Sequence, residues 1–281
     1  MKKNVFFLLV GPISIALAIV LFLPLVSVLI PTFIAEGAFS LESYLEFFRD
    51  PYYMKIFVRT LRVSIICAVV CTILGVPTAY YVSRTSKKVR GILMAISLFP
   101  LLTNSVIRAF AWINVLGKNG IINKFLGLFG VEPISMLYTE FSVLIGTIYL
   151  FLPLMIITLV GVMENINNDM LEAAESLGAN KLVGFFKVIL PMSIPGIITG
   201  FVLVFTGAMT AYTTPQLLGG PKNMLLSTLI YQRAYTLNDW TSASVIALIM
   251  IITTMAVMKG LNAIAAKLDK REGKAWERTV Y

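Results

Sequence analysis

Few residues of this chain could carry out chemistry by themselves. It contains no histidine, which removes the most common metal ligand, the usual proton shuttle and the Ser-His and Cys-His nucleophilic sites. Cys67 and Cys71 lie four residues apart in an apolar run, without a further ligand or Cys-x-x-Cys spacing, and we interpret both as small packing residues. The chain also lacks Gly-x-x-x-x-Gly-Lys-Ser/Thr, the loop that cradles the phosphates of ATP. We therefore predict no catalytic, metal or cofactor site.

A second group of residues could contact a transported solute. These residues are polar or aromatic and lie inside otherwise apolar stretches, where lipid-facing positions need neither property. Ordinary explanations compete, because Tyr and Trp anchor helices at the membrane interface and Asn or Thr bonds across helices. The candidates are Asn104, Arg108, Trp112, Tyr149, Tyr212 and Gln216.

Of these candidates, Arg108 has the highest free-energy cost of placement in a membrane, because it is charged. A guanidinium within an apolar stretch must pair, face an aqueous cavity or extend to the lipid headgroups. Its position toward the outer half of its stretch favours extension to the outer headgroups. Solute contact is the alternative that we retain.

The elements that would position these residues are membrane-spanning helices. Of the 281 residues 58% are apolar and 13% charged, and the mean hydropathy is +0.87, whereas a soluble domain is about 45–50% apolar and about a quarter charged. We predict an all-α integral membrane protein, with residues 1–281 forming one domain. Each predicted span has at least the ~20 residues that a helix needs to cross the hydrocarbon. The six spans are 6–34, 60–83, 91–117, 141–163, 193–218 and 243–266.

The basic residues predict the orientation of these spans. Fourteen Lys and Arg residues fall at the termini and in the loops on one side of the six spans, and six fall on the other side. Cytoplasmic loops collect Lys and Arg, so both termini are predicted to be cytoplasmic. The net charge of +9 thus reflects membrane topology, and we expect no nucleic-acid partner. A short helix over 121–129 is expected to lie at the outer surface or dip into the membrane.

The cytoplasmic segment 164–191 differs from an ordinary basic loop. It is amphipathic, Asn168 or Asp169 is suited to cap its first helix, and Gly178 is expected to stop or bend that helix. One apolar face would project from the membrane and require cover by a partner protein. This face consists of Met170, Leu171, Ala174 and Leu177.

The same segment resembles a known signature. Glu172-Ala173-Ala174, then Gly178, then Leu190-Pro191 are similar in type and spacing to the Glu-Ala-Ala loop of permease subunits in binding-protein-dependent ABC importers. The family usually has Ile where this chain has Val188, which is a conservative departure. Further segments look like the first permease subunit of spermidine/putrescine importers. They are residues 75–85, 108–112, 120–123, 137–139, 219–220 and 239–240.

The resemblance implies a type I ABC importer permease in a prokaryotic plasma (inner) membrane. In that family the loop forms coupling helices that sit in a cleft of the ATPase, so Glu172, Ala173, Ala174, Gly178, Leu190 and Pro191 become candidate coupling residues. The implied partners are a dimer of ATPase subunits that binds ATP-Mg, a second permease, an extracytoplasmic solute-binding protein and membrane lipid. The chain itself is expected to be a transport subunit without enzymatic activity or bound cofactor. A self-contained channel or secondary transporter is the competing class. Ion coupling in such proteins uses intramembrane carboxylates or histidines, which the predicted spans lack.

The identity of the solute stays open at this point. Polyamines are the first expectation, while the same machinery imports opines, aminoethylphosphonate and other small organic solutes in similar permeases. None of the six spans contains Asp or Glu, although carboxylates or aromatic rings would stabilise a polyamine. The carboxylates could come from Glu140 and Glu164, from the second permease or from the binding protein. Otherwise the solute would be anionic or zwitterionic.

Two glycines in the fifth span suggest close helix packing. Gly196 and Gly200 lie four residues apart, so they share one face of a helix. That face would contact another helix of the same subunit or of the second permease. A hinge after Pro195 is the alternative.

Overall fold

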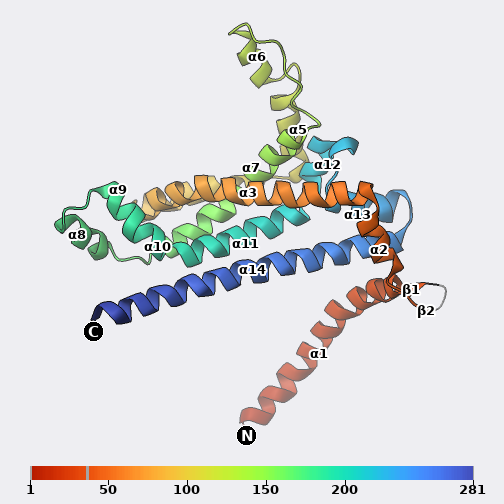
Figure 1. Ribbon diagram of the computed structural model, residues 1–281, viewed down its shortest axis with the longest axis horizontal. Coiled ribbons are helices and arrows are strands. Elements are labelled where there is room, and N and C mark those ends of the chain that lie inside the picture. Colours follow the sequence, from red (N-terminus) through yellow and green to blue (C-terminus); the bar gives the residue numbers. More distant parts are fainter. Residues whose placement is uncertain (1, 36–37, 281) are drawn as a thin grey trace. The chain divides into compact units, whose positions relative to one another are not determined.

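The computed structural model describes residues 2–35 and 38–280, and these are almost entirely helical (Figure 1). A small antiparallel sheet pairs Ile34 with Phe39 and Ala35 with Ala38. Two segments, η2 and η4, are π-helical. In chain order the elements are α1 (Lys2–Leu29), η1 (Ile30–Phe33), β1 (Ile34–Ala35), β2 (Ala38–Phe39), α2 (Glu42–Arg49), α3 (Pro51–Ser83), α4 (Lys87–Leu102), α5 (Ser105–Leu116), α6 (Ile121–Gly127), α7 (Glu140–Met163), α8 (Asn168–Ser176), α9 (Lys181–Gly184), η2 (Phe185–Ile189), α10 (Leu190–Met192), α11 (Ile194–Thr210), α12 (Thr213–Gly219), η3 (Pro221–Asn223), α13 (Leu226–Tyr231), η4 (Gln232–Thr236) and α14 (Trp240–Val280).

The described residues fall into two compact units. The first combines the described part of residues 1–55 with Thr228–Ile252, and the second combines Ile56–Ser227 with the described part of residues 253–281. Every candidate residue for coupling or solute contact belongs to the second unit.

In the first unit, short contacts hold η1 against α2 and fix the start of α14. The Thr32 hydroxyl lies 2.6 Å from Tyr44 Oη, and the Asp239 carboxylate accepts a 3.0 Å hydrogen bond from the Ser242 N–H. Burial alone would raise the pKa of Asp239, but hydrogen bonds from Ser242 and the charge of Arg233 hold that pKa below its usual value. The carboxylate is therefore ionised at neutral pH, where it complements the dipole of α14.

Helix α7 is the central helix of the second unit, because α4, α5, α11 and α12 all pack against it. A capping box fixes its first turn. Thr139 Oγ1 accepts a hydrogen bond from the Ser142 N–H, and Ser142 Oγ accepts one from the Thr139 N–H.

Small residues of α3 face α7. Cys67 and Cys71 are both buried and free, and Cys71 Sγ lies 3.8 Å from the carbonyl oxygen of Ile148. One turn further along, a Cβ atom at Gly75 would lie 2.8 Å from Met155 Cγ. The structure thus confirms the interpretation of both cysteines as packing residues.

Four helical segments are long and apolar enough to cross a membrane: Ser14–Phe33, Pro51–Ser83, Glu140–Met163 and Trp240–Ala263. Two further pairs of helices satisfy the same criteria together but are bent. The angle is 93° between Lys87–Leu102 and Ser105–Gly127, and 66° between Lys181–Met192 and Ile194–Thr210. If each bent pair is one span, the count rises to six.

Helix breaks interrupt two of the predicted continuous spans, and the second of these breaks is distinct from the 66° bend between Met192 and Ile194. The stretch 91–117 is divided between α4 and α5 at Thr103 and Asn104, and the stretch 193–218 is divided between α11 and α12 after Thr210. Hydropathy registers apolar length and does not register a change of direction, so it joined helices that the backbone separates. Helix α3 also begins at Pro51, before the predicted start at residue 60, and its first turns include the charged residues Lys55 and Arg59.

Glycines of α11 give close contact with α7 of the same chain. A Cβ atom at Gly196 would lie 2.7 Å from Val162 Cγ2, and one at Gly200 would overlap Met155 Sδ. Of the alternatives for these glycines, the structure thus supports packing within the subunit.

We predict that Gly196→Ala destabilises the protein and that Gly161→Ala, a matched change on α7, does not. Val162 is β-branched and stiff, so the added methyl would force overpacking that costs about 1–3 kcal/mol. A Cβ atom at Gly161 meets nothing within 4 Å, and alanine is favoured over glycine in a helix. Thermal unfolding in detergent measures both changes, and equal midpoints for the two variants would refute this packing.

Candidate functional sites

The segment after α7 folds as two short helices, α8 and α9. They lie together at the end of the second unit where α3 ends and α11 begins (Figure 1). Asn167 caps α8, because its side chain accepts a hydrogen bond from the Asp169 N–H at 3.2 Å. The prediction that Asn168 or Asp169 forms this cap is therefore wrong by one or two positions.

Gly178 ends α8 in a left-handed conformation, with φ of 90°. The Gly178 N–H donates to the Glu175 carbonyl at 2.9 Å, and the Ala179 N–H donates to the Ala174 carbonyl at 3.0 Å. This pair of bonds is the Schellman arrangement, which satisfies the last carbonyls of a helix and favours glycine at the left-handed position. The structure thus confirms that Gly178 stops the helix.

The predicted apolar face of α8 is partly covered within the chain. Leu171 packs over Gly184 of α9, where a Cβ atom would lie 2.5 Å from Leu171 Cδ1. Leu177, in contrast, is 90% exposed, and Met170 is also exposed. Glu172 and Ala173 are exposed, and Ala174 is half-buried. The exposed side of α8 therefore presents a small apolar surface, formed by Met170 and Leu177, beside the carboxylate of Glu172.

Leu190 and Pro191 lie in α10, where the loop returns to α11. Both are half-buried, and Ser193 Oγ donates to the Ile189 carbonyl at 2.7 Å. Leu190 and Pro191 thus belong to the base of the loop, whereas the Glu172–Gly178 portion forms its exposed part. Their role in coupling stays a prediction.

Arg108 lies at the break between α4 and α5, and it is buried. Its Nη1 donates hydrogen bonds to the carbonyl oxygens of Pro100 and Thr103, which the break leaves without helical partners. A cation at a helix C-terminus also complements the dipole of α4. The structure therefore corrects the expectation that this side chain extends to the outer headgroups.

A cavity of about 300 Å³ opens beside Arg108. The rings of Trp112 and Tyr149 form part of its wall, in edge-to-face contact with centroids 5.5 Å apart. Phe99 and Thr103 contribute from the other side of the break. The cavity thus combines aromatic faces with one guanidinium, and it brings together three of the six candidate residues for solute contact.

The other three candidates do not line this cavity. Asn104 caps α5 by accepting hydrogen bonds from the Val106 and Ile107 N–H groups. Tyr212 is half-buried at the start of α12, and Gln216 is exposed on α12, which packs against α5 and α7. Asn104 therefore has a structural role at the helix break.

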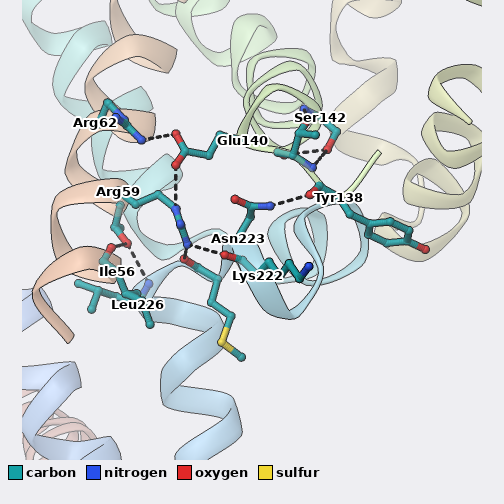
Figure 2. A network of polar contacts seen from close by, with 12 residues as sticks. Ile56, Arg59, Arg62, Tyr138, Glu140, Ser142, Lys222, Asn223 and Leu226 are labelled. Atoms are coloured by element: carbon teal, nitrogen blue, oxygen red, sulfur yellow. Dashed lines mark hydrogen bonds and ion pairs between the residues drawn. The ribbon is translucent and has the colours of Figure 1, made fainter. Parts of the chain in front are cut away.

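Sequence reasoning missed a network of polar contacts at the N-terminal end of α7. The Glu140 carboxylate accepts a 2.9 Å hydrogen bond from Arg59 Nε and also pairs with Arg62 (Figure 2). Arg59 Nη1 also donates to the carbonyl oxygens of Lys222 and Met224 at 3.0 and 3.4 Å. Arg59 and Arg62 lie at the edge of an apolar stretch, and this position was the sequence feature that indicated a need for acidic partners. The network ties together α3, α7, η3 and the residue directly after η3.

Both carboxylates that flank α7 are paired with arginine. Glu140 contacts Arg59 and Arg62, and Glu164 at the other end pairs with Arg90. Neither carboxylate is thus free to balance the charge of a cationic solute. One source of carboxylates considered from the sequence is therefore used in holding the helices together.

Arg59 and Arg62 offer a matched test of this network. Arg59→Met removes the hydrogen bonds that a buried guanidinium donates to Glu140 and to the Lys222 carbonyl, and it is expected to cost about 2–3 kcal/mol of unfolding free energy. Arg62 has a half-exposed side chain, so Arg62→Met is expected to cost less than about 1 kcal/mol. Denaturant titration of both variants checks the difference, and an Arg62 variant as unstable as the Arg59 variant would count against it.

Comparison with known proteins agrees with this architecture. Residues 71–273 match the family described as "Binding-protein-dependent transport system inner membrane component". The spermidine/putrescine transport system permease protein PotB of Haemophilus influenzae is 36% identical over 83% of this chain and 82% of its own length. PotB of Escherichia coli K12 is 33% identical over 79% of this chain and 80% of its own length.

A solved structure shows the same fold. The bacterial alginate ABC transporter, in complex with an alginate pentasaccharide-bound periplasmic protein, matches with a TM-score of 0.80 at 17% identity, covering 95% of this chain and 96% of that chain. The fold is thus an all-α, multi-pass membrane permease of type I. With the family profile covering most of its length, this chain belongs to the inner-membrane components of binding-protein-dependent transport systems.

Proposed function

We propose that this chain is one permease subunit of an ATP-driven polyamine importer. The observation that carries the proposal is its identity of 33–36% with two PotB proteins over about four-fifths of both chains. The proposed partners are a second permease, an extracytoplasmic solute-binding protein and a dimer of ATPase subunits that holds ATP-Mg. The chain itself would contribute a transport pathway and a coupling loop, with no cofactor of its own.

The proposed coupling uses α8 as the element that the ATPase moves. Leu177 and Met170 provide apolar surface, and burial of such surface favours docking of a partner. ATP would close the ATPase dimer, α8 would move with it, and the helices around α7 would change from inward-open to outward-open. The orientation proposed from the basic residues places α8 on the cytoplasmic side, with both termini.

The proposed solute is a spermidine- or putrescine-like cation. Support comes from the PotB relatives, which are named as spermidine/putrescine permeases. Trp112 and Tyr149 add support, because their ring faces attract ammonium groups and pack on methylenes. Arg108 opposes a cation, although its Nη1 is engaged by two helix carbonyls. Opines and aminoethylphosphonate are the alternative solutes, and Arg108 would favour an anionic group.

Replacing the two rings tests the solute. In proteoliposomes with the complete complex, Trp112→Ala and Tyr149→Ala are each expected to lower spermidine uptake about five- to thirtyfold, corresponding to the loss of a desolvated cation–π contact. Tyr81→Ala removes an exposed ring of α3 and serves as the control. Wild-type uptake by both cavity variants would exclude the rings from the path. Uptake of an anionic solute that polyamines never inhibit would reject the polyamine assignment while leaving the family intact.

The left-handed Gly178 provides a test of coupling. Gly178→Val is expected to lower solute-stimulated ATP hydrolysis several-fold, because a β-branched residue at positive φ is strained by about 1–2 kcal/mol. Gly178→Asn should retain most of this activity, since asparagine tolerates the conformation. The ATPase rate of purified complexes measures both. Equal rates for Val, Asn and wild type would contradict a coupling role for the end of α8.

Cysteine labelling tests the orientation. Lys181→Cys, exposed in α9, should react with a membrane-impermeant maleimide only after cells are opened. Lys118→Cys, exposed on the opposite predicted side, should react in intact cells. The reverse pattern would overturn the assignment of sides.

A further inference from the structure

The segment between α7 and α8 is held by one arginine directly after α3 and one in α4. Arg84 Nη1 donates a 3.1 Å hydrogen bond to the carbonyl oxygen of Ile166. Arg90 pairs with Glu164, with the Arg90 side chain 17% exposed and the Glu164 side chain 47% exposed. A partly buried pair of this kind is screened less than a surface pair. Two guanidinium groups therefore fix the start of the coupling loop.

The far side of the loop is held by the same end of α3. The ring of Tyr80 lies 4.8 Å from the ring of Phe185, which begins η2. The Arg84 guanidinium carbon lies 5.7 Å from the centroid of that Tyr80 ring, within cation–π range. Arg84 and Tyr80 thus connect the two sides of the loop through adjacent side chains.

The loop between these two attachments is itself packed. Leu171 of α8 lies over Gly184 of α9, and α8 also packs against η2. Ile166, whose carbonyl accepts from Arg84, is buried. A displacement of α8 would consequently move the whole loop together, since packed interiors transmit displacement.

We infer that Tyr80, Arg84 and Arg90, which we call the cytoplasmic clasp, are positioning residues that transmit movement of α8 to α3 and α4. The inference rests on the proposed function, in which α8 docks on the ATPase. The clasp divides the basic residues between the end of α3 and the first turn of α4 into two roles. Arg84 and Arg90 are half-buried and bonded to the loop. Lys87 and Lys88 are exposed, as expected of basic residues that determine membrane orientation.

The coupling ratio tests the clasp in complexes reconstituted with the ATPase, the second permease and the binding protein. Arg90→Glu and Glu164→Arg should each raise the ATP hydrolysed per spermidine imported about three- to thirtyfold. The double exchange should return this ratio toward the wild-type value, because the pair is restored with reversed sign. Tyr80→Leu, which keeps apolar volume, should raise the ratio as well, and Lys88→Ala should not. Wild-type ratios in Arg90→Glu and Tyr80→Leu would overturn the inference.

Hydrogen exchange of the α8 and α9 amides gives a readout that does not depend on the solute. In the same complexes, exchange is expected to accelerate about tenfold in Arg90→Glu and Tyr80→Leu, since local opening becomes easier. Lys88→Ala should leave exchange unchanged. If the wild-type complex shows no spermidine-stimulated hydrolysis, the proposed function fails, and exchange still decides the clasp. Unchanged exchange in both clasp variants would refute it.

Discussion

The structure depends on one constraint, that backbone polar groups in a bilayer must be satisfied inside the protein. Continuous helices meet it automatically, but each break releases carbonyl and N–H groups. Arg108 donates to the carbonyls freed at the end of α4, and Asn104 accepts from the N–H groups at the start of α5. At the break after α11, Ser227 Oγ donates to the Ala211 carbonyl at 2.5 Å. The breaks are thus built features, and the first of them borders the cavity.

The charged groups at the ends of α7 are likewise satisfied within the protein. Its two terminal carboxylates, Glu140 and Glu164, pair with arginines from α3 and α4. These pairs fix the central helix at both ends, one within the Arg59 network and one beside the loop that carries α8. They also leave aromatic rings as the groups of the cavity best suited to a cation. A polyamine would therefore receive its balancing carboxylates from the second permease or the binding protein.

Much of this arrangement was predictable from the sequence, and the exceptions share a physical cause. The Glu-Ala-Ala loop, its stop at Gly178 and the packing role of Cys67 and Cys71 follow from local spacing and residue type. The break at Thr103 and the partners of Arg108 were missed, because hydropathy is unchanged across the bend and the acceptor carbonyls exist only once the helix is broken. Nor could local pattern show that Arg59 reaches Glu140, which is far away in sequence. Contacts between distant elements require the fold.

In the proposed mechanism, the exposed C-terminal end of α8 docks on a separate ATPase subunit. Site-directed cross-linking measures this most directly, with a photoreactive residue in place of Leu177 in the assembled complex. We predict a cross-link to the ATPase that changes in yield when ATP is bound. Leu128, an exposed apolar residue after α6, should give no such product when replaced in the same way. Absence of an ATPase cross-link from position 177 in an intact complex would contradict the claim.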